Sequence, residues 1–365
     1  MNQQIRFCTG RDEVKIAYAL SGEGPPLAMC APWLTHLDHQ WRSLAWRPWL
    51  ETFSSEYTLL RYDSRGCGLS DREVEDVSFE SWVRDFESVV DAAGFDRFAL
   101  LGACQGGPTA IEYAARHPER VDRLILYGTY ARGRAKRTNL PQQAEKAKVL
   151  IEMTKLGWGD ENHAFLQVWA SQFQPGGSLE HLRSWSEQQR LSTSAEMAVR
   201  LMEAGWNIDV TQAAKRVRCP VLIVQADRDA VTPLEEARLL AGMIPNCRYV
   251  QLDSNNHMPL ADEPAWSRLV EEVRGFLAEP VPARTAGRRS LPLGDLTRQE
   301  RNVLERIARG LDNAQIAGSL GLSEKTVRNH ITRVLDKLDV QHRYQAIVLA
   351  REAGLGTEER PADPP

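Results

Sequence analysis

The chain has 365 residues, of which 42% are hydrophobic and 26% are charged. This composition is typical of a folded protein with about two or three domains, and it excludes a chain that is disordered throughout. The net charge is only −4, but residues 296–351 contain ten Lys and Arg against six Asp and Glu. A basic C-terminal segment on an acidic body indicates a nucleic-acid-binding module joined to a different domain.

The six cysteines are too widely spaced for a zinc site, and no secretory signal precedes them. We therefore expect reduced thiols in a cytoplasmic protein. We also expect a soluble protein, because no apolar run approaches the roughly 18 residues of a membrane span. His36 and His39 are close in the sequence, and we expect structural or ligand-contact roles for them rather than a metal site, and no cofactor.

Apolar strand-like segments and helical segments alternate over the first 130 residues. A hairpin formed by residues 4–9 and 15–20 predicts the edge of a sheet. Strands separated by helices of this length predict a parallel sheet covered on both faces, which is the α/β class. The later strands are predicted at 26–30, 57–63, 98–101 and 123–128, and the helices at 39–54, 78–93 and 108–117.

The alternation stops at about residue 130 and resumes at about residue 215. The intervening segment is helical, polar and rich in tryptophan, which predicts a helical cap inserted over the sheet. Its tryptophans either pack the cap or form an aromatic lid over a ligand cleft. The sheet then continues with strands at 220–225 and 248–252, a helix from 234 and a closing helix at 264–278.

A very tight turn is predicted between Gly102 and Gly107, after a strand and before a helix. Such a turn pushes the side chain at its apex out of the sheet, and it requires small residues two positions before and after the apex. Gly102 and Gly106 meet this requirement around Cys104. The sequence therefore predicts a nucleophile elbow that carries cysteine where serine is usual.

Two later loops supply possible partners for this cysteine. Asp227 and Asp229 follow one predicted strand, and His257 follows the next. The order nucleophile, acid, histidine, each after the carboxyl end of a strand, is that of the α/β-hydrolases. Residues 1–279 resemble an α/β-hydrolase domain throughout, and residues 63–71 match the D-x-R-G-x-G-x-S turn of that family. The resemblance implies an α/β-hydrolase fold with a helical cap at about 130–215.

The resemblance also implies a role for each residue of the site. Cys104 would be the nucleophile, His257 the base, and Asp229 the acid that orients the base, with Asp227 as the alternative. Backbone N–H groups would bind the oxyanion, although the residue at position 32 is a proline without an N–H. The oxyanion site and ligand pocket are predicted to contain Gln105, Trp33 and His36.

A different pattern follows the hydrolase-like segment. Residues 280–292 are rich in proline and arginine and lack helical or strand periodicity, which predicts a linker. A capping box at Thr297 then begins a helix. A second helix is predicted between residues 312 and 321, and a third at 324–338.

The third helix has apolar residues on one face and polar and basic residues on the other. A helix, a glycine turn and a helix with a basic outer face predict a helix-turn-helix. Arg and Asn can make bidentate contacts with base edges, and Lys, His and Arg can reach phosphates. The predicted DNA contacts are Lys325, Thr326, Arg328, Asn329, His330, Thr332, Arg333 and Lys337.

Residues 296–351 resemble the LuxR/GerE-type helix-turn-helix family, most clearly over residues 320–330. The resemblance implies double-stranded DNA as the partner and a homodimer, which members often form through the last helix, here at about 343–353. It thereby implies operator half-sites related by two-fold symmetry. The DNA-binding domain would span 293–356, and residues 357–365 would be a tail.

These features predict a ligand-responsive transcriptional regulator whose α/β-hydrolase-like sensor domain binds a small, largely apolar molecule. A second hypothesis is a weak or vestigial Cys-His-Asp hydrolase, acting on an ester, lactone or thioester and coupled to DNA binding. A third hypothesis is a thiol redox sensor that acts through Cys104.

Overall fold

The computed structural model of the chain divides into two compact units, Met1–Glu279 and Pro280–Pro365. It describes residues 3–137, 141–158, 164–280 and 296–338, and the single residues Val340, Arg343, Ala346, Ile347, Ala350, Leu355 and Gly356. The predicted linker beyond Pro280, the predicted tail and most of the predicted last helix lie outside these residues. Within the described ranges, no helix combines the length and the apolar character that a membrane crossing requires.

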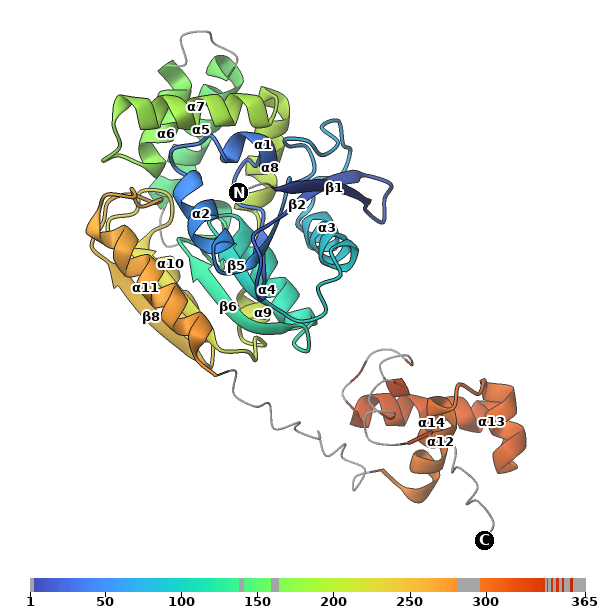
Figure 1. The fold of residues 1–365 in the computed structure, drawn as a ribbon. Helices are drawn as coiled ribbons and strands as arrows, with labels where there is room; N and C mark the ends of the chain where they lie inside the picture. The colour runs from blue at the N-terminus through green and yellow to red at the C-terminus, as the bar shows by residue number, and fades with distance from the viewer. Residues whose placement is uncertain are drawn as a thin grey trace. The chain divides into compact units, whose positions relative to one another are not determined.

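Eight strands form one sheet in the N-terminal unit (Figure 1). They are β1 Gln4–Thr9, β2 Lys15–Ser21, β3 Pro26–Cys30, β4 Thr58–Tyr62, β5 Phe98–Ala103, β6 Val121–Tyr127, β7 Val221–Ala226 and β8 Cys247–Leu252. Their order in the sheet is β1-β2-β4-β3-β5-β6-β7-β8. The strands from β3 to β8 pair in parallel, whereas β1 and β2 form an antiparallel hairpin at one edge. This mostly parallel sheet confirms the predicted α/β class.

Helices cover both faces of the sheet (Figure 1). One layer contains α3 (Phe79–Ala92), α4 (Gly106–Arg116), α9 (Thr211–Ala214) and α10 (Leu234–Met243), which contact one another in that order. The other contains α2 (Arg47–Ser54) and α11 (Pro264–Ala278), where the rings of Trp49 and Trp266 lie 5.4 Å apart. Every residue of β7 is buried, as expected for a strand covered on both sides.

The segment before β4 differs from the prediction. The sequence predicts one helix at residues 39–54, but the structure has α1 (Leu37–Gln40) and, separately, α2. Pro48 lies in the first turn of α2. Because proline has no N–H and clashes with the preceding turn, it is tolerated at the start of a helix and not in its interior. The proline therefore separates the two helices.

Four longer helices form an insertion between β6 and β7 (Figure 1). They are α5 (Pro141–Gly157), α6 (Ala164–Phe173), α7 (Leu179–Ser192) and α8 (Ala195–Trp206). Trp169 of α6 stacks on Trp33 with ring centroids 6.1 Å apart, and Trp185 of α7 meets Trp46 edge-on at 6.4 Å. Both tryptophans of the insertion are buried. They pack the insertion onto the loop after β3 and onto the start of α2.

The turn between β5 and α4 carries Cys104 at its apex. The φ angle of Cys104 is 49°, in the left-handed region that non-glycine residues rarely adopt. A Cβ atom at Gly102 would lie 2.7 Å from the Cβ of Ala110 and 2.8 Å from the backbone of α4. At Gly106, it would lie 2.5 Å from the carbonyl oxygen of Cys30. The close approach of β3, β5 and α4 therefore requires both glycines.

The C-terminal unit contains α12 (Arg298–Ala308), α13 (Asn313–Leu320) and α14 (Glu324–Lys337). Capping boxes begin α12 and α13, and Gly321 ends α13 with a φ angle of 64°. Side chains from all three helices share one core, made of Val303, Ile307, Ile316, Ala317, Val327 and Ile331. Two helices joined by a short turn and supported by a third are the arrangement of a helix-turn-helix.

Replacing Gly102 with alanine is expected to destabilise the N-terminal unit by about 1–3 kcal/mol, because the added methyl group has no room beside α4. The control is Gly275→Ala in α11, where nothing lies within 4 Å of the added Cβ. Alanine there should stabilise the helix by up to about 1 kcal/mol. All ten tryptophans precede residue 280, so urea unfolding followed by tryptophan fluorescence reports on this unit alone. If the Gly102→Ala protein has the same free energy of unfolding as wild type, β5 and α4 do not approach each other as closely as described.

Candidate active site and DNA-binding surface

Backbone hydrogen bonds hold Cys104 on both sides of its strained turn. Its N–H donates to the carbonyl oxygen of Tyr127 at 2.9 Å. Its own carbonyl oxygen accepts from the Thr129 hydroxyl at 2.6 Å and from the N–H of Gly107 at 3.2 Å. Cys104 is only 7% exposed, so a molecule that reaches its sulfur must enter a nearly closed space.

The structure brings His257 and Asp229 together below the elbow. His257 Nδ1 lies 2.7 Å from Oδ2 of Asp229, and both side chains are at most 1% exposed. The other carboxylate oxygen of Asp229 accepts from the N–H groups of Val231 and Thr232 at 2.7 and 2.9 Å. Asp227 instead accepts from the N–H of Ser254 and from Arg228. Of the two candidate acids, Asp229 is therefore the one that orients His257.

With Nδ1 bonded to Asp229, the reactive nitrogen of His257 is Nε2. This nitrogen is buried and makes no hydrogen bond to a nitrogen or oxygen atom of the described part of the chain. Burial by itself lowers the pKa of His257, but the Asp229 carboxylate and the Cys104 thiol outweigh burial and raise that pKa to about 10. The imidazole is therefore protonated near neutral pH.

Three neighbours fix the position of the His257 ring. The Tyr127 hydroxyl donates to the carbonyl oxygen of His257 at 2.8 Å. Phe173 meets the ring edge-on, with centroids 5.5 Å apart. Gly128 has a φ angle of 54°, and a Cβ atom there would lie 2.8 Å from Cε1 of His257. Because Phe173 belongs to α6, the insertion forms part of the wall around the histidine.

Gln105 and Trp33, the predicted oxyanion donors, line one narrow pocket with Pro32 and with Leu201 of α8. The pocket has room for about one water molecule. Gln105 is the N-cap of α4, where the helix dipole favours negative charge. The structure thus brings these two residues to the same space next to the elbow.

His36 lies apart from this pocket, at the start of α1. Its Nδ1 accepts a hydrogen bond from the N–H of His39 at 3.3 Å. Burial lowers the pKa of His36, so the ring is neutral near pH 7, as this capping contact requires. Over the described residues, no three His, Cys, Asp or Glu side chains are grouped closely enough to hold a metal ion.

Arg65 is a buried charge for which the sequence predicted no role, although it belongs to the matched glycine turn. Its guanidinium group donates to both carboxylate oxygens of Asp85 at 2.7 Å. It also donates to those of Asp12 at 2.7 and 3.1 Å, and to the carbonyl oxygen of Asp76 at 2.9 Å. Arg65 is 1% exposed. It therefore ties the glycine turn to α3 and to the N-terminal hairpin.

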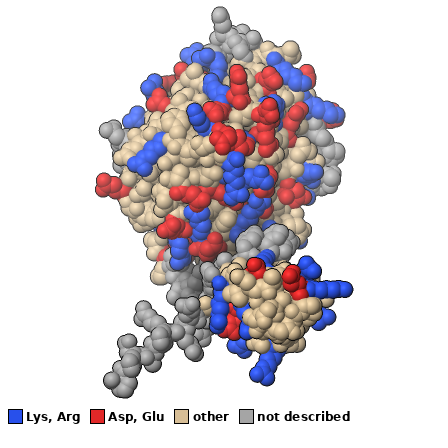
Figure 2. Space-filling model, turned by 90° about the vertical axis from the view of Figure 1, so that its right-hand side faces the viewer, with Lys and Arg blue, Asp and Glu red and all other residues tan. Residues whose placement is uncertain are grey.

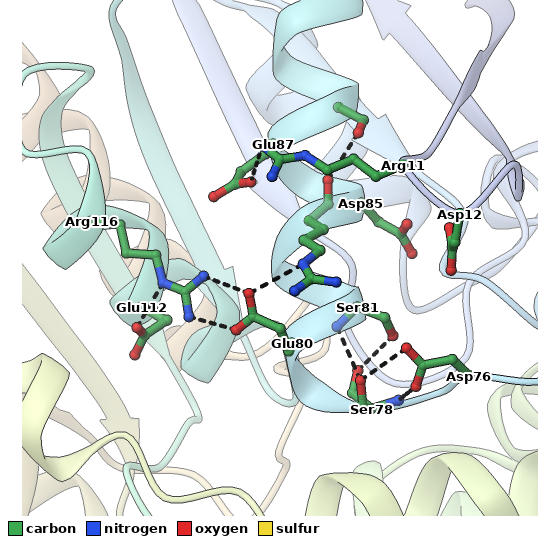
Figure 3. Close-up of polar contacts among 12 residues, drawn as sticks. Arg11, Asp12, Asp76, Ser78, Glu80, Ser81, Asp85, Glu87, Glu112 and Arg116 are labelled. Carbon is green, nitrogen blue, oxygen red and sulfur yellow. Dashed lines mark hydrogen bonds and ion pairs between the residues drawn. The ribbon is translucent and has the colours of Figure 1, made fainter. Parts of the chain in front are cut away.

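A second group of ion pairs joins α3 to α4 (Figure 3). Arg116 of α4 binds Glu80 of α3 through two hydrogen bonds of 2.7 and 3.0 Å and contacts Glu112 at 2.8 Å. Exposed ion pairs contribute little stability individually, but the two-point geometry defines how the helices are placed. The elbow at Cys104 lies just before the first turn of α4, and Arg116 is in the last turn of the same helix. The contact therefore holds α4, and with it the elbow, against α3.

Five of the predicted DNA contacts form one exposed face of α14. They recur at three- and four-residue spacing, which places them on one side of the helix, and they are Lys325, Arg328, Asn329, Thr332 and Arg333. The opposite side is buried and consists of Val327, Ile331 and Val334. On the face drawn in Figure 2, mainly basic side chains surround an uncharged area of the C-terminal unit. The exposed Lys, Arg and Asn side chains of α14 suit phosphate and base contacts.

The other three predicted contacts already have structural partners or are partly covered. The Thr326 hydroxyl lies 2.8 Å from that of Ser323 in the cap of α14. His330 is half-buried. Lys337 donates to Oε2 of Glu300 at 2.7 Å, and Lys337 together with the N–H of Thr297 lowers the pKa of Glu300 to about 2. Lys337 therefore joins α14 to α12.

Comparison with known proteins agrees with the geometry of the C-terminal unit. Residues 295–350 match the family described as "Bacterial regulatory proteins, luxR family". The transcriptional regulatory protein LiaR of Bacillus subtilis is 32% identical over 154 residues, which cover 41% of this chain and 71% of LiaR. The chain belongs to the LuxR family.

The N-terminal unit of this LuxR-family protein is similar to α/β-hydrolases. Residues 39–164 match the family described as "alpha/beta hydrolase fold", and residues 192–284 match "TAP-like protein". The pyrrolizixenacetamide deacetylase of Xenorhabdus hominickii is 22% identical over 271 residues, which cover 74% of this chain and 97% of the deacetylase. An esterase from Exiguobacterium antarcticum, 22% identical, superposes with a TM-score of 0.65 over 75% of this chain and 99% of the esterase. These findings confirm the predicted α/β-hydrolase fold.

Asp229→Asn is expected to lower the pKa of His257 from about 10 toward its ordinary value of about 6.5, which NMR titration of the imidazole would measure. The raised pKa stabilises the folded protein fully below about pH 6.5, and this stabilisation is lost as the pH rises through about 10. The free energy of unfolding in urea should therefore change less between pH 6 and pH 10 in Asp229→Asn than in wild type. Asp227→Asn is the control and should retain the wild-type difference. An unchanged pKa in Asp229→Asn would show that another group controls His257.

Arg328→Ala is expected to weaken binding of the LuxR-family protein to its operator by about tenfold to a hundredfold, the usual cost of a lost base contact. The operator is first selected from random duplex DNA with the wild-type protein, and affinity is then measured by fluorescence anisotropy at one salt concentration. Arg309→Ala is the matched control, because Arg309 pairs with Glu305 on α12, away from the α14 face. Equal affinities of Arg328→Ala and wild type would mean that this part of α14 does not read the bases.

Proposed function

We propose that this LuxR-family protein regulates transcription in response to a small molecule bound by its α/β-hydrolase-like domain. The observation that carries the proposal is the presence, in one chain, of a buried enzyme-type site around Cys104 and an exposed basic face on α14. The first is suited to small molecules and the second to DNA. A ligand-controlled regulator uses both.

The walls of the pocket at Gln105 and Trp33 support a small, largely apolar ligand. The apolar residues of the lining include Pro32, Leu34, Trp82 and Leu201. Because the space now holds about one water molecule, a ligand enters by moving α8, whose Gly205 packs against the Gln105 side chain. Ligand binding would therefore change the position of the helical insertion relative to the sheet. Ligand binding changes DNA binding only if the ligand has different affinities for the DNA-bound and DNA-free arrangements of the protein.

A homodimer is the assembly that this proposal requires. Two copies of α14 would enter successive major grooves, and the operator would consist of two half-sites related by two-fold symmetry. We place the protein in the cytoplasm because its DNA partner is there.

The second candidate function is a thiol hydrolase, favoured by the buried His257–Asp229 pair and by the electrostatic interaction of Cys104 with His257. In the acylation step, the Cys104 thiolate forms a bond to the substrate carbonyl carbon. The alkoxide then leaves with a proton from His257. Water, deprotonated by His257, cleaves the thioester and releases the acid. The oxyanion would be held by the backbone N–H groups of Gln105 and Trp33.

Redox sensing by Cys104 has less support. Cys67, in the glycine turn, lines the same pocket as Gln105 and would be a partner for a disulfide. Burial raises the pKa of Cys67 to about 12, and a thiol with so little thiolate exchanges slowly.

Mass spectrometry of the purified full-length protein, compared with Cys104→Ser, separates the first two candidates. A regulator is expected to release a small molecule on denaturation, and adding it back should change operator affinity by about 5- to 150-fold. The effect should persist in Cys104→Ser. A hydrolase is expected to show a mass increase on Cys104 that Cys104→Ser lacks and that decays as product forms. If operator affinity responds to no recovered molecule, the proposed sensor function is wrong.

A further inference from the structure

The loop after β6 brings three arginines together next to the candidate active site. Arg132, Arg134 and Arg137 lie within a span of six residues. Arg132 and Arg137 share one carboxylate, that of Glu236 in α10. Oε1 of Glu236 lies 2.7 Å from Nη2 of Arg132 and 3.9 Å from Nε of Arg137. Glu236 is fully buried. The cluster therefore carries more positive charge than the described residues neutralise.

Arg134 is the least paired member of the cluster. It is 8% exposed, and the one hydrogen bond of its side chain to a described residue runs from Nη2 to the carbonyl oxygen of Val231 at 3.3 Å. No carboxylate of the described ranges forms an ion pair with it. The neighbouring Arg137 has a buried Nη1 without a described partner, and its guanidinium lies 5.1 Å from the ring centre of Tyr130. Burying a guanidinium without an anion is costly.

Backbone contacts locate this cluster beside the elbow. A Cβ atom at Gly133 would lie 2.5 Å from the carbonyl oxygen of Gly205, and one at Gly205 would lie 3.2 Å from the Gln105 side chain. The loop therefore packs on the end of α8, which in turn packs on the residue after Cys104. Arg134 also bonds to Val231, the residue whose N–H donates to Asp229.

The electrostatic neighbours of Arg134 agree with this position. Burial and the charge of Arg137 lower the pKa of Arg134, whereas Tyr130, Cys104 and Asp229 act in the opposite direction. The guanidinium group is thus within electrostatic range of both the nucleophile position and the acid.

We propose that Arg134 binds a carboxylate group of the ligand, with Arg137 adding positive charge behind it. A planar carboxylate matches the donor geometry of a guanidinium. This inference rests on the proposed function, and it defines the ligand class further: a small acyl compound with an apolar body at the tryptophan-lined pocket and a carboxylate at Arg134. The anion supplies the charge that the arginine cluster lacks.

The test uses the full-length protein and two thiol reagents of similar size, iodoacetate and iodoacetamide, which differ by one negative charge. With either reagent, the Cys104 sulfur forms a bond to carbon, iodide leaves with the electrons of the C–I bond, and the thiol proton passes to water. Peptide mass spectrometry gives the rate at each cysteine. The half-buried Cys247 of the same molecule calibrates the intrinsic difference between the reagents.

The iodoacetate-to-iodoacetamide rate ratio at Cys104, normalised to Cys247, is expected to fall about tenfold in Arg134→Gln. Arg134→Lys should keep most of the preference. Arg228→Gln is the control, because it removes the same charge from a side chain that is 58% exposed and paired with Asp253, and it should leave the ratio unchanged. Tryptophan fluorescence verifies that each variant is folded.

A ratio that Arg134→Gln leaves unchanged would overturn the proposal. So would a Cys104 that reacts with neither reagent, because a larger carboxylate could then not reach Arg134. The outcome is independent of any regulatory response. If Arg134→Gln lowers the ratio but no carboxylate alters operator affinity, the anion site stands and the proposed function fails. If the ratio is unchanged while a neutral ligand alters operator affinity, the proposed function stands and the anion site fails.

Discussion

The N-terminal unit depends on the close approach of β5 to α4. A strand that becomes a helix within two residues forces Cys104 into the left-handed region. The cost of this strain is offset by the hydrogen bond from Cys104 N–H to Tyr127 and by those that Cys104 accepts from Thr129 and Gly107. Only glycine leaves enough room at positions 102 and 106. The same turn places Gln105, at the start of α4, in one pocket with Trp33 of the loop after β3. One strained residue therefore organises all the chemistry of this unit.

The charges around this turn share one physical consequence. His257 is held protonated by Asp229 and the thiol, and Arg134 adds a second buried positive charge within electrostatic range of the same thiol. Charge interactions are strong in a site that excludes water. A thiolate, an oxyanion or a bound carboxylate would each be stabilised there. The proposed anion binding and the proposed acyl chemistry would therefore depend on the same arrangement of charges.

In the C-terminal unit, one side of α14 is buried in the core and the other is exposed. Val327, Ile331 and Val334 supply the core, and the residues between them present a basic face. Helical periodicity separates the two sides, so the exposed face could be predicted without a structure. Lys337 is the informative exception. It has the spacing and charge of a DNA contact, but its ammonium group is paired with Glu300 across the domain.

The sequence by itself determined the order of strands and helices, the elbow at Cys104 and the recognition helix, because their signals are local: glycine spacing, capping residues and periodic apolar positions. The sequence did not distinguish between Asp227 and Asp229 as the acid of the site. The structure shows that Asp229 contacts His257. Only the tertiary structure decided the anchoring of Arg65, the stacking of Trp169 on Trp33 and the position of Arg134, which forms no ion pair within the described ranges. These contacts join residues far apart in the chain. Which residues meet depends on how the helices pack on the sheet, and no local sequence pattern specifies that packing.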